Sequence, residues 1–139
     1  MRAILHLLIG SLVIGTVGCG TSADVDKFEL DIAVDAPQAT SVVIDDKRTL
    51  PPTGAVYSQG FPSVSAAMTV HGTVETVNAD GSVRAMAAYD LGSYCSGQMP
   101  LLRQTLHFAE SLDGSGNPQL ALGSVECEKT DGTGTIVMP

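Results

Sequence analysis

Hydrophobic and polar residues alternate over several stretches of this chain, and such alternation is typical of β-strands with one buried face. The segment Phe28–Asp35 is the clearest case, because its even-numbered positions are apolar and most of its odd-numbered positions are acidic. Its apolar side chains should face a core, and Glu29, Asp31 and Asp35 should face solvent. A shorter β-branched strand is expected at 41–44, ending in the turn residues 45–47, and a brief strand is expected around Val56.

The segments 64–77 and 82–91 alternate as well, and the sequence Asn78-Ala79-Asp80-Gly81 between them carries hairpin-turn chemistry. For the two apolar faces to coincide, the loop should contain an even number of residues. A four-residue loop would place Glu75 opposite Arg84, whereas a two-residue loop would place His71 opposite Asp90.

The segment 101–112 fits two patterns. Leu102, Leu106 and Phe108 alternate with polar residues as in a strand, whereas Leu102, Leu106, Ala109 and Leu112 form a helical stripe. We favour the strand, followed by a hairpin loop at 113–118 and a strand at 119–128. In that strand the apolar positions change phase, which predicts a β-bulge near Gly123. A final strand is expected over 133–138.

About seven short strands separated by turns predict an all-β fold, an immunoglobulin-like β-sandwich forming a single domain over residues 28–139. The alternative is an α+β fold with one helix near 101–112. The core tryptophan of immunoglobulin domains has no counterpart, because the chain contains no Trp. The expected core consists of Phe28, Leu30, Ile32, Val70, Val74, Val83, Ala85, Tyr89 and Leu106.

The amino-terminal segment has the pattern of a secretory signal peptide. Arg2 precedes a mainly apolar run over 3–17, which is shorter than the roughly 20 residues that span a bilayer. The sequence Thr16-Val17-Gly18-Cys19 resembles the lipobox of bacterial lipoproteins, although that family usually has Leu at the position of Thr16. The resemblance implies a signal peptide over 1–18, acylation of Cys19 as the mature amino terminus, and a flexible lipidated tether over 19–27.

The same resemblance implies a location. In that family an Asp directly after the cysteine retains the protein in the inner membrane, and here Gly20 follows, which indicates the outer membrane of a Gram-negative cell. The alternative is cleavage after Ala23 in Thr21-Ser22-Ala23, which would give a soluble periplasmic or secreted protein. A third possibility is an uncleaved membrane anchor.

The chain has three cysteines, an odd number for an exported protein. If Cys19 carries lipid, as the resemblance implies, Cys95 and Cys127 remain to form a disulfide. Such a bond would stabilise the fold by roughly 3 to 4 kcal/mol on the chain-entropy model.

The charge balance disfavours nucleic acid as a partner. Seven basic residues stand against fifteen acidic ones, for a net charge of −8, and loss of Arg2 with the leader makes the mature chain more negative. Phosphate binding requires clustered Lys and Arg. Attachment to a membrane should therefore come from acyl chains on Cys19.

No motif in the chain indicates catalysis, a cofactor or a metal site. Asp113-x-Ser115-x-Asn117 resembles the start of a calcium-binding loop, but Pro118 stands where the glycine of that loop is needed. The sequence therefore favours a non-catalytic, lipid-anchored cell-envelope protein whose β-domain binds or scaffolds an envelope protein or polysaccharide. The alternative is a small hydrolase or cation-dependent enzyme in which His71, Asp90 and His107 converge in one cleft.

Overall fold

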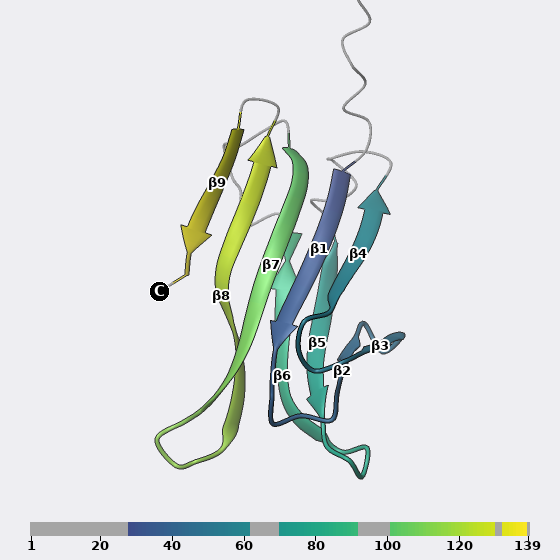
Figure 1. The fold of residues 1–139 in the computed structure, drawn as a ribbon, viewed down its shortest axis with the longest axis vertical. Coiled ribbons are helices and arrows are strands. Elements are labelled where there is room, and N and C mark those ends of the chain that lie inside the picture. Colours follow the sequence, from purple (N-terminus) through teal and green to yellow (C-terminus); the bar gives the residue numbers. More distant parts are fainter. Residues whose placement is uncertain (1–27, 62–69, 92–100, 130–131, 139) are drawn as a thin grey trace, which may run out of the picture.

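The computed structural model describes residues 28–61, 70–91, 101–129 and 132–138, and these residues form an all-β sandwich (Figure 1). The described part of the chain contains nine strands and no long helix. Their bounds are β1 Phe28–Asp35, β2 Ser41–Ile44, β3 Arg48–Leu50, β4 Val56–Phe61, β5 His71–Val77, β6 Val83–Asp90, β7 Leu101–Leu112, β8 Pro118–Lys129 and β9 Gly132–Val137.

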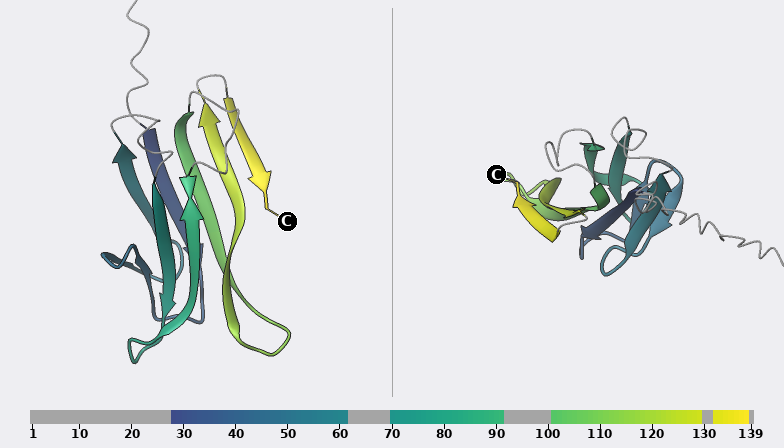
Figure 2. Two further views of the ribbon diagram at one scale, coloured as in Figure 1. Left: turned by 180° about the vertical axis from the view of Figure 1, so that it is seen from behind. Right: turned by 90° about the horizontal axis from the view of Figure 1, so that it is seen from above.

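The strands form two sheets that lie face to face (Figure 2). One sheet has five strands in the order β4-β1-β7-β8-β9, and the other has four in the order β3-β2-β5-β6. Within the first sheet β1 and β7 run parallel, whereas the other neighbouring strands are antiparallel. In immunoglobulin domains the sheets follow the orders ABED and CFG. Here β1 lies inside a sheet between β4 and β7, so the sandwich is confirmed but the immunoglobulin-like arrangement is not.

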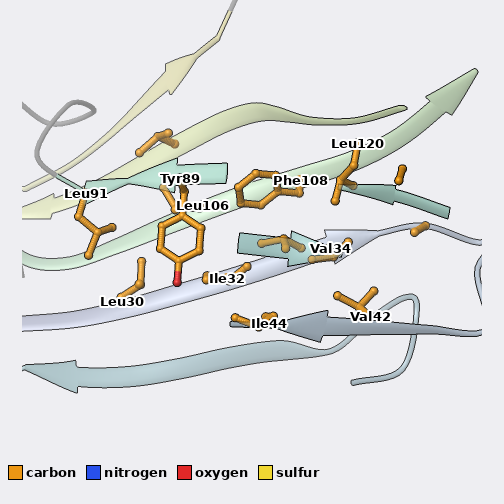
Figure 3. Close-up of a cluster of buried hydrophobic side chains, with 14 of the residues drawn as sticks. Leu30, Ile32, Val34, Val42, Ile44, Tyr89, Leu91, Leu106, Phe108 and Leu120 are labelled. Atoms are coloured by element: carbon orange, nitrogen blue, oxygen red, sulfur yellow. The ribbon is translucent and has the colours of Figure 1, made fainter. Parts of the chain in front are cut away.

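A single hydrophobic cluster fills the space between the sheets (Figure 3). The apolar face of β1 supplies Phe28, Leu30, Ile32 and Val34, all buried as the alternation predicted. Two tilted aromatic pairs add to this layer, Phe28 with Phe61 at 6.0 Å and Tyr89 with Phe108 at 6.5 Å between ring centroids. The remaining buried apolar side chains are Ala36, Ala39, Val42, Ile44, Val74, Ala85, Leu91, Leu106, Leu120, Val125 and Cys127.

Three local predictions are confirmed. Strands β1 and β2 have the expected bounds, and residues 101–112 form strand β7, so the helical alternative for this segment is wrong. The predicted bulge is also present, because His107 pairs with Ser124 and Phe108 with Leu122, which leaves Gly123 as the extra residue. This bulge lets Leu120 and Val125, which are out of phase in the sequence, both face the core.

The β5–β6 hairpin corrects the expected register. His71 does lie opposite Asp90, but Glu75 lies opposite Met86, and near the turn Val77 pairs with Val83. The expectation of an even loop was wrong, because a bulge between Thr76 and Val77 changes the register within the hairpin.

The expected core needs two corrections in the same region. Val83 is 54% exposed because it lies beyond the bulge, and Val70 is only partly buried. The remainder of the expected strand at 64–77, over 64–69, lies outside the described residues.

The bulge also explains the position of Arg84. The pairing around Thr76 leaves Arg84 as an extra residue on β6, and a bulge redirects the side chains beside it. The Arg84 Nε atom lies 2.7 Å from Glu110 Oε1, and the Glu110 side chain is only 3% exposed. The buried Thr76 hydroxyl donates to Glu110 Oε2 at 2.8 Å. This buried ion pair therefore connects β6 and β5 of one sheet with β7 of the other.

Candidate functional site: the outer face of the five-stranded sheet

The outer face of the five-stranded sheet carries most of the charged side chains that the structure brings together. The side chains on this face come from the strand positions that alternate with the core positions. Five carboxylates and one guanidinium are among the described side chains there: Glu29, Asp31, Asp35, Glu126, Glu128 and Arg103. The face is therefore strongly acidic.

Arg103 lies at the centre of three of these carboxylates. Its Nη2 atom lies 2.7 Å from Glu29 Oε2, its Nε atom 3.5 Å from Asp31 Oδ2, and its Nη1 atom 3.7 Å from Glu128 Oε2. The hydrogen bond to Glu29 and the surrounding negative charge raise the pKa of Arg103. One guanidinium cannot neutralise three carboxylates, so net negative charge remains at this position.

The parallel pairing of β1 with β7 creates this cluster. It places Glu29 opposite Arg103 and Asp31 opposite Thr105, while the antiparallel β7–β8 pairing places Glu128 on the other side of Arg103. On the β4 side the Ser58 hydroxyl donates to Asp31 Oδ1 at 2.6 Å. The acidic row of β1 was predicted to face solvent, and it lies on the outer face of the sheet, although the Asp31 side chain is only 14% exposed.

A shallow hollow of about 420 Å³ lies beside this cluster, over β1, β7 and the start of β4. Small residues form much of its lining, among them Ala33, Ala109 and the bulge residue Gly123. His107 also lines it, and its Nε2 atom lies 3.2 Å from Glu126 Oε1. That contact lacks hydrogen-bond geometry, although the Nε2 atom is shielded from solvent. The two side chains are 40% and 45% exposed, so the contact lies at an open surface.

The structure does not bring His71, Asp90 and His107 into one cleft. His71 Nδ1 lies 3.5 Å from Asp90 Oδ2 on the outer face of the four-stranded sheet, where the His71 side chain is 72% exposed. His107 lies on the outer face of the opposite sheet, and the hydrophobic core separates the two faces. The expected convergence of His71, Asp90 and His107 is therefore not found.

The loop at 113–117 is organised by its own carboxylate. Asp113 Oδ1 accepts hydrogen bonds from the backbone N–H groups of Ser115 and Asn117, both at 2.8 Å, and these bonds lower the pKa of Asp113. The carboxylate thus replaces the missing backbone partners of a tight loop. Within the described ranges, no group of three or more His, Cys, Asp or Glu side chains is arranged to hold a metal ion.

Most of the residues in the lipidation and disulfide predictions lie outside the described residues. Cys19, Ala23 and Cys95 lie outside the described residues, while Cys127 is buried on the inner face of β8. None of the described segments contains a helix with the length and apolar character to cross a membrane. The lipidation of Cys19 and the pairing of Cys95 with Cys127 stay predictions.

Sequence reasoning missed the contacts that define this face. Arg103 and Glu29 are 74 residues apart, and no local pattern indicates that β1 and β7 are neighbours. The only available signal was the phase of the alternation, which puts Arg103, His107 and the acids of β1 on polar faces. No family model, curated protein or solved structure matches the chain.

Proposed function

We propose that this chain is a non-catalytic, lipid-anchored protein of the cell envelope whose β-sandwich binds another envelope component through the outer face of its five-stranded sheet. The observation that carries the binding role is the acidic cluster around Arg103 beside a shallow hollow. Cross-strand ion pairs on a rigid sheet hold the side chains of this cluster in one geometry, as a specific binding surface requires.

The proposed anchor rests on the sequence Thr16–Cys19 and on the start of the sandwich soon after it. The tether over 19–27 would hold the end of the sandwich where β1 begins closest to the membrane. The long strands of the five-stranded sheet would then present their outer face to the side, within reach of other envelope components.

A disulfide between Cys95 and Cys127 is part of the proposal. Cys127 is 2% exposed, and a buried position on a central strand suits a structural bond better than a reactive thiol. An exported location would favour the oxidised form.

Lipidation can be distinguished from ordinary secretion with two single variants. Cys19→Ser should move the protein from the membrane fraction to the soluble exported fraction, because it removes the acylated residue. Ala23→Leu should leave the protein membrane-bound, because it blocks only a cleavage that requires a small residue at that position. Fractionation and mass spectrometry of the mature amino terminus provide the measurement. An unlipidated wild-type chain beginning at Asp24 would refute the anchor.

The binding surface can be located by cross-linking in cells. A photoreactive amino acid at Thr105, between Asp31 and Glu126 on the proposed binding face, should give a discrete cross-linked product after irradiation. The matched position is Ala88, which is exposed on the outer face of the opposite sheet and should give none. Purification of the tagged product from solubilised envelopes would identify the partner. Equal products from both positions would contradict the assignment of this face.

A further inference from the structure

Strand β4 forms an edge of the five-stranded sheet, and its own sequence lacks the usual protection against strand addition. Among the described strands β4 pairs with β1 alone, so no described strand pairs with the backbone groups on its other side. Proteins usually protect such edges with charged residues, proline or a bulge. The β4 sequence VYSQGF contains no charge and no proline, and all six residues pair with β1 in one continuous register.

The other described edges differ from β4. Strand β6 carries a bulge at Arg84, near one of its ends, and has the charged residue Asp90 at its other end. Strand β3 is only three residues long. Strand β9 contains two glycines, which weaken a strand, whereas β4 contains one. The β4 edge is therefore the best template for an added strand in the part of the chain that the structure describes.

Two of the three outward positions of β4 carry small residues next to acids of β1, whereas the third, Val56, pairs with Ala33. Gly60 pairs with Glu29 and Ser58 pairs with Asp31. A strand added to the free edge would lie two strand spacings from β1, about 10 Å away. Only long side chains could cross the small residues of β4 and reach these carboxylates. A Lys or Arg side chain has that length, and the negative charge that Arg103 leaves unneutralised would attract it.

The alternative occupant is a second copy of the chain. Antiparallel pairing of two identical β4 edges would reverse β1 in one copy, so the two tethers would begin at opposite ends of the joined sheet. Those ends would be separated by the length of β1, about 27 Å for eight residues. With β1 perpendicular to the membrane, one nine-residue tether could cover that distance only when almost fully extended, at up to about 3.4 Å per residue. A strand from another protein meets no such constraint.

From these observations we propose that the β4 edge binds an extended segment of a partner protein with Lys or Arg at alternate positions. Backbone hydrogen bonds to β4 would supply affinity, and the basic side chains reaching Glu29 and Asp31 would supply specificity. The proposal rests on the proposed function, since it names the partner class of that binding face.

Binding can be tested on the full exported chain purified in detergent, with a fluorescein-labelled peptide of the sequence Val-Lys-Val-Lys-Val-Lys-Val. We expect saturable binding by fluorescence anisotropy and slower hydrogen exchange of β4 amides in the complex. Ser58→Lys should weaken binding at least about tenfold, because it places a like charge beside the peptide and occupies Asp31. Ser58→Thr is the matched control and should bind like the wild type.

Two control peptides separate strand addition from simple attraction to an acidic protein. A peptide of the same composition in the order Val-Val-Val-Val-Lys-Lys-Lys, and one with Glu in place of Lys, should both bind at least about tenfold more weakly. Equal binding of the reordered peptide, no effect of Ser58→Lys, or no binding at all would overturn the proposal. Self-association that protects β4 and disappears in Ser58→Lys would assign the edge to a second copy.

The outcome is independent of the lipid anchor. The Cys19→Ser variant should bind the peptide as well as the wild type, because the tether is not part of the edge. A chain that binds the peptide but carries no lipid would refute the anchor and leave the edge assignment standing. A lipidated chain that does not bind the peptide would support the anchor and refute the edge assignment.

Discussion

Replacing Arg84 by Met should lower the free energy of unfolding by about 4 kcal/mol, because it leaves a buried carboxylate without its counter-charge. The Glu110 side chain is 3% exposed and contacts Arg84 and the Thr76 hydroxyl. Of these two partners, only the Thr76 hydroxyl would remain after the substitution. Chemical denaturation of the exported chain, followed by far-ultraviolet circular dichroism, provides the measurement.

A matched substitution and a double variant test the cause of this loss. Arg103→Met removes an arginine that also pairs with carboxylates, but its side chain is 46% exposed, so the change should cost far less than Arg84→Met. Adding Glu110→Leu to Arg84→Met should restore most of the lost stability, because an apolar pair can replace a buried ion pair. Equal losses for Arg84→Met and Arg103→Met, or no rescue in the double variant, would show that burial of the pair does not determine its effect.

The sequence predicted local features of the fold well, for a physical reason. Alternation reports which face of a strand is buried, and it does so within a single segment, as in β1 and β7. The bulge at Gly123 was visible in the same way, because the apolar positions on either side of it are out of phase. These features need no knowledge of neighbouring strands.

Pairing between distant strands could not be predicted, because alternation does not identify the neighbour of a strand. The parallel contact of β1 with β7 brings Glu29 to Arg103, and the sandwich brings Arg84 to Glu110. Both pairs join residues far apart in the sequence, and the second depends on a bulge that local pattern did not indicate. The immunoglobulin-like arrangement was not confirmed for the same reason, because it specifies an order of strands that alternation does not report.

The position of Tyr89 depends on a glycine that the sequence did not single out. Tyr89 pairs across the strands with Gly72, and its hydroxyl donates a hydrogen bond to Asp45 Oδ2 at 2.9 Å. Burial is the main cause that raises the pKa of this hydroxyl, and the bond to Asp45 adds to it. The other oxygen of Asp45 accepts the Thr73 backbone N–H at 2.8 Å, so the ring is held between two strands and a turn.

Gly72→Ala should lower the free energy of unfolding by about 4 kcal/mol, because the added Cβ atom would overlap the Tyr89 ring and the Asp45 carboxylate. Tyr89 is 3% exposed and contacts Phe108, so moving its ring away from the added atom would disrupt its packing in the core. The expected loss is therefore close to that of truncating a buried aromatic side chain.

Gly60→Ala is the matched control, since Gly60 is also a strand glycine but nothing lies within 4 Å of the position of its added Cβ atom. It should leave stability unchanged or raise it slightly, by up to about 1 kcal/mol. In a Tyr89→Ala background, Gly72→Ala should cost much less than in the wild type, because the overlapping ring is gone. Denaturation of the wild type, the two single variants at Gly72 and Tyr89, and their double variant measures this coupling. Strictly additive losses would mean that Gly72 is required for a reason other than the space that Tyr89 occupies.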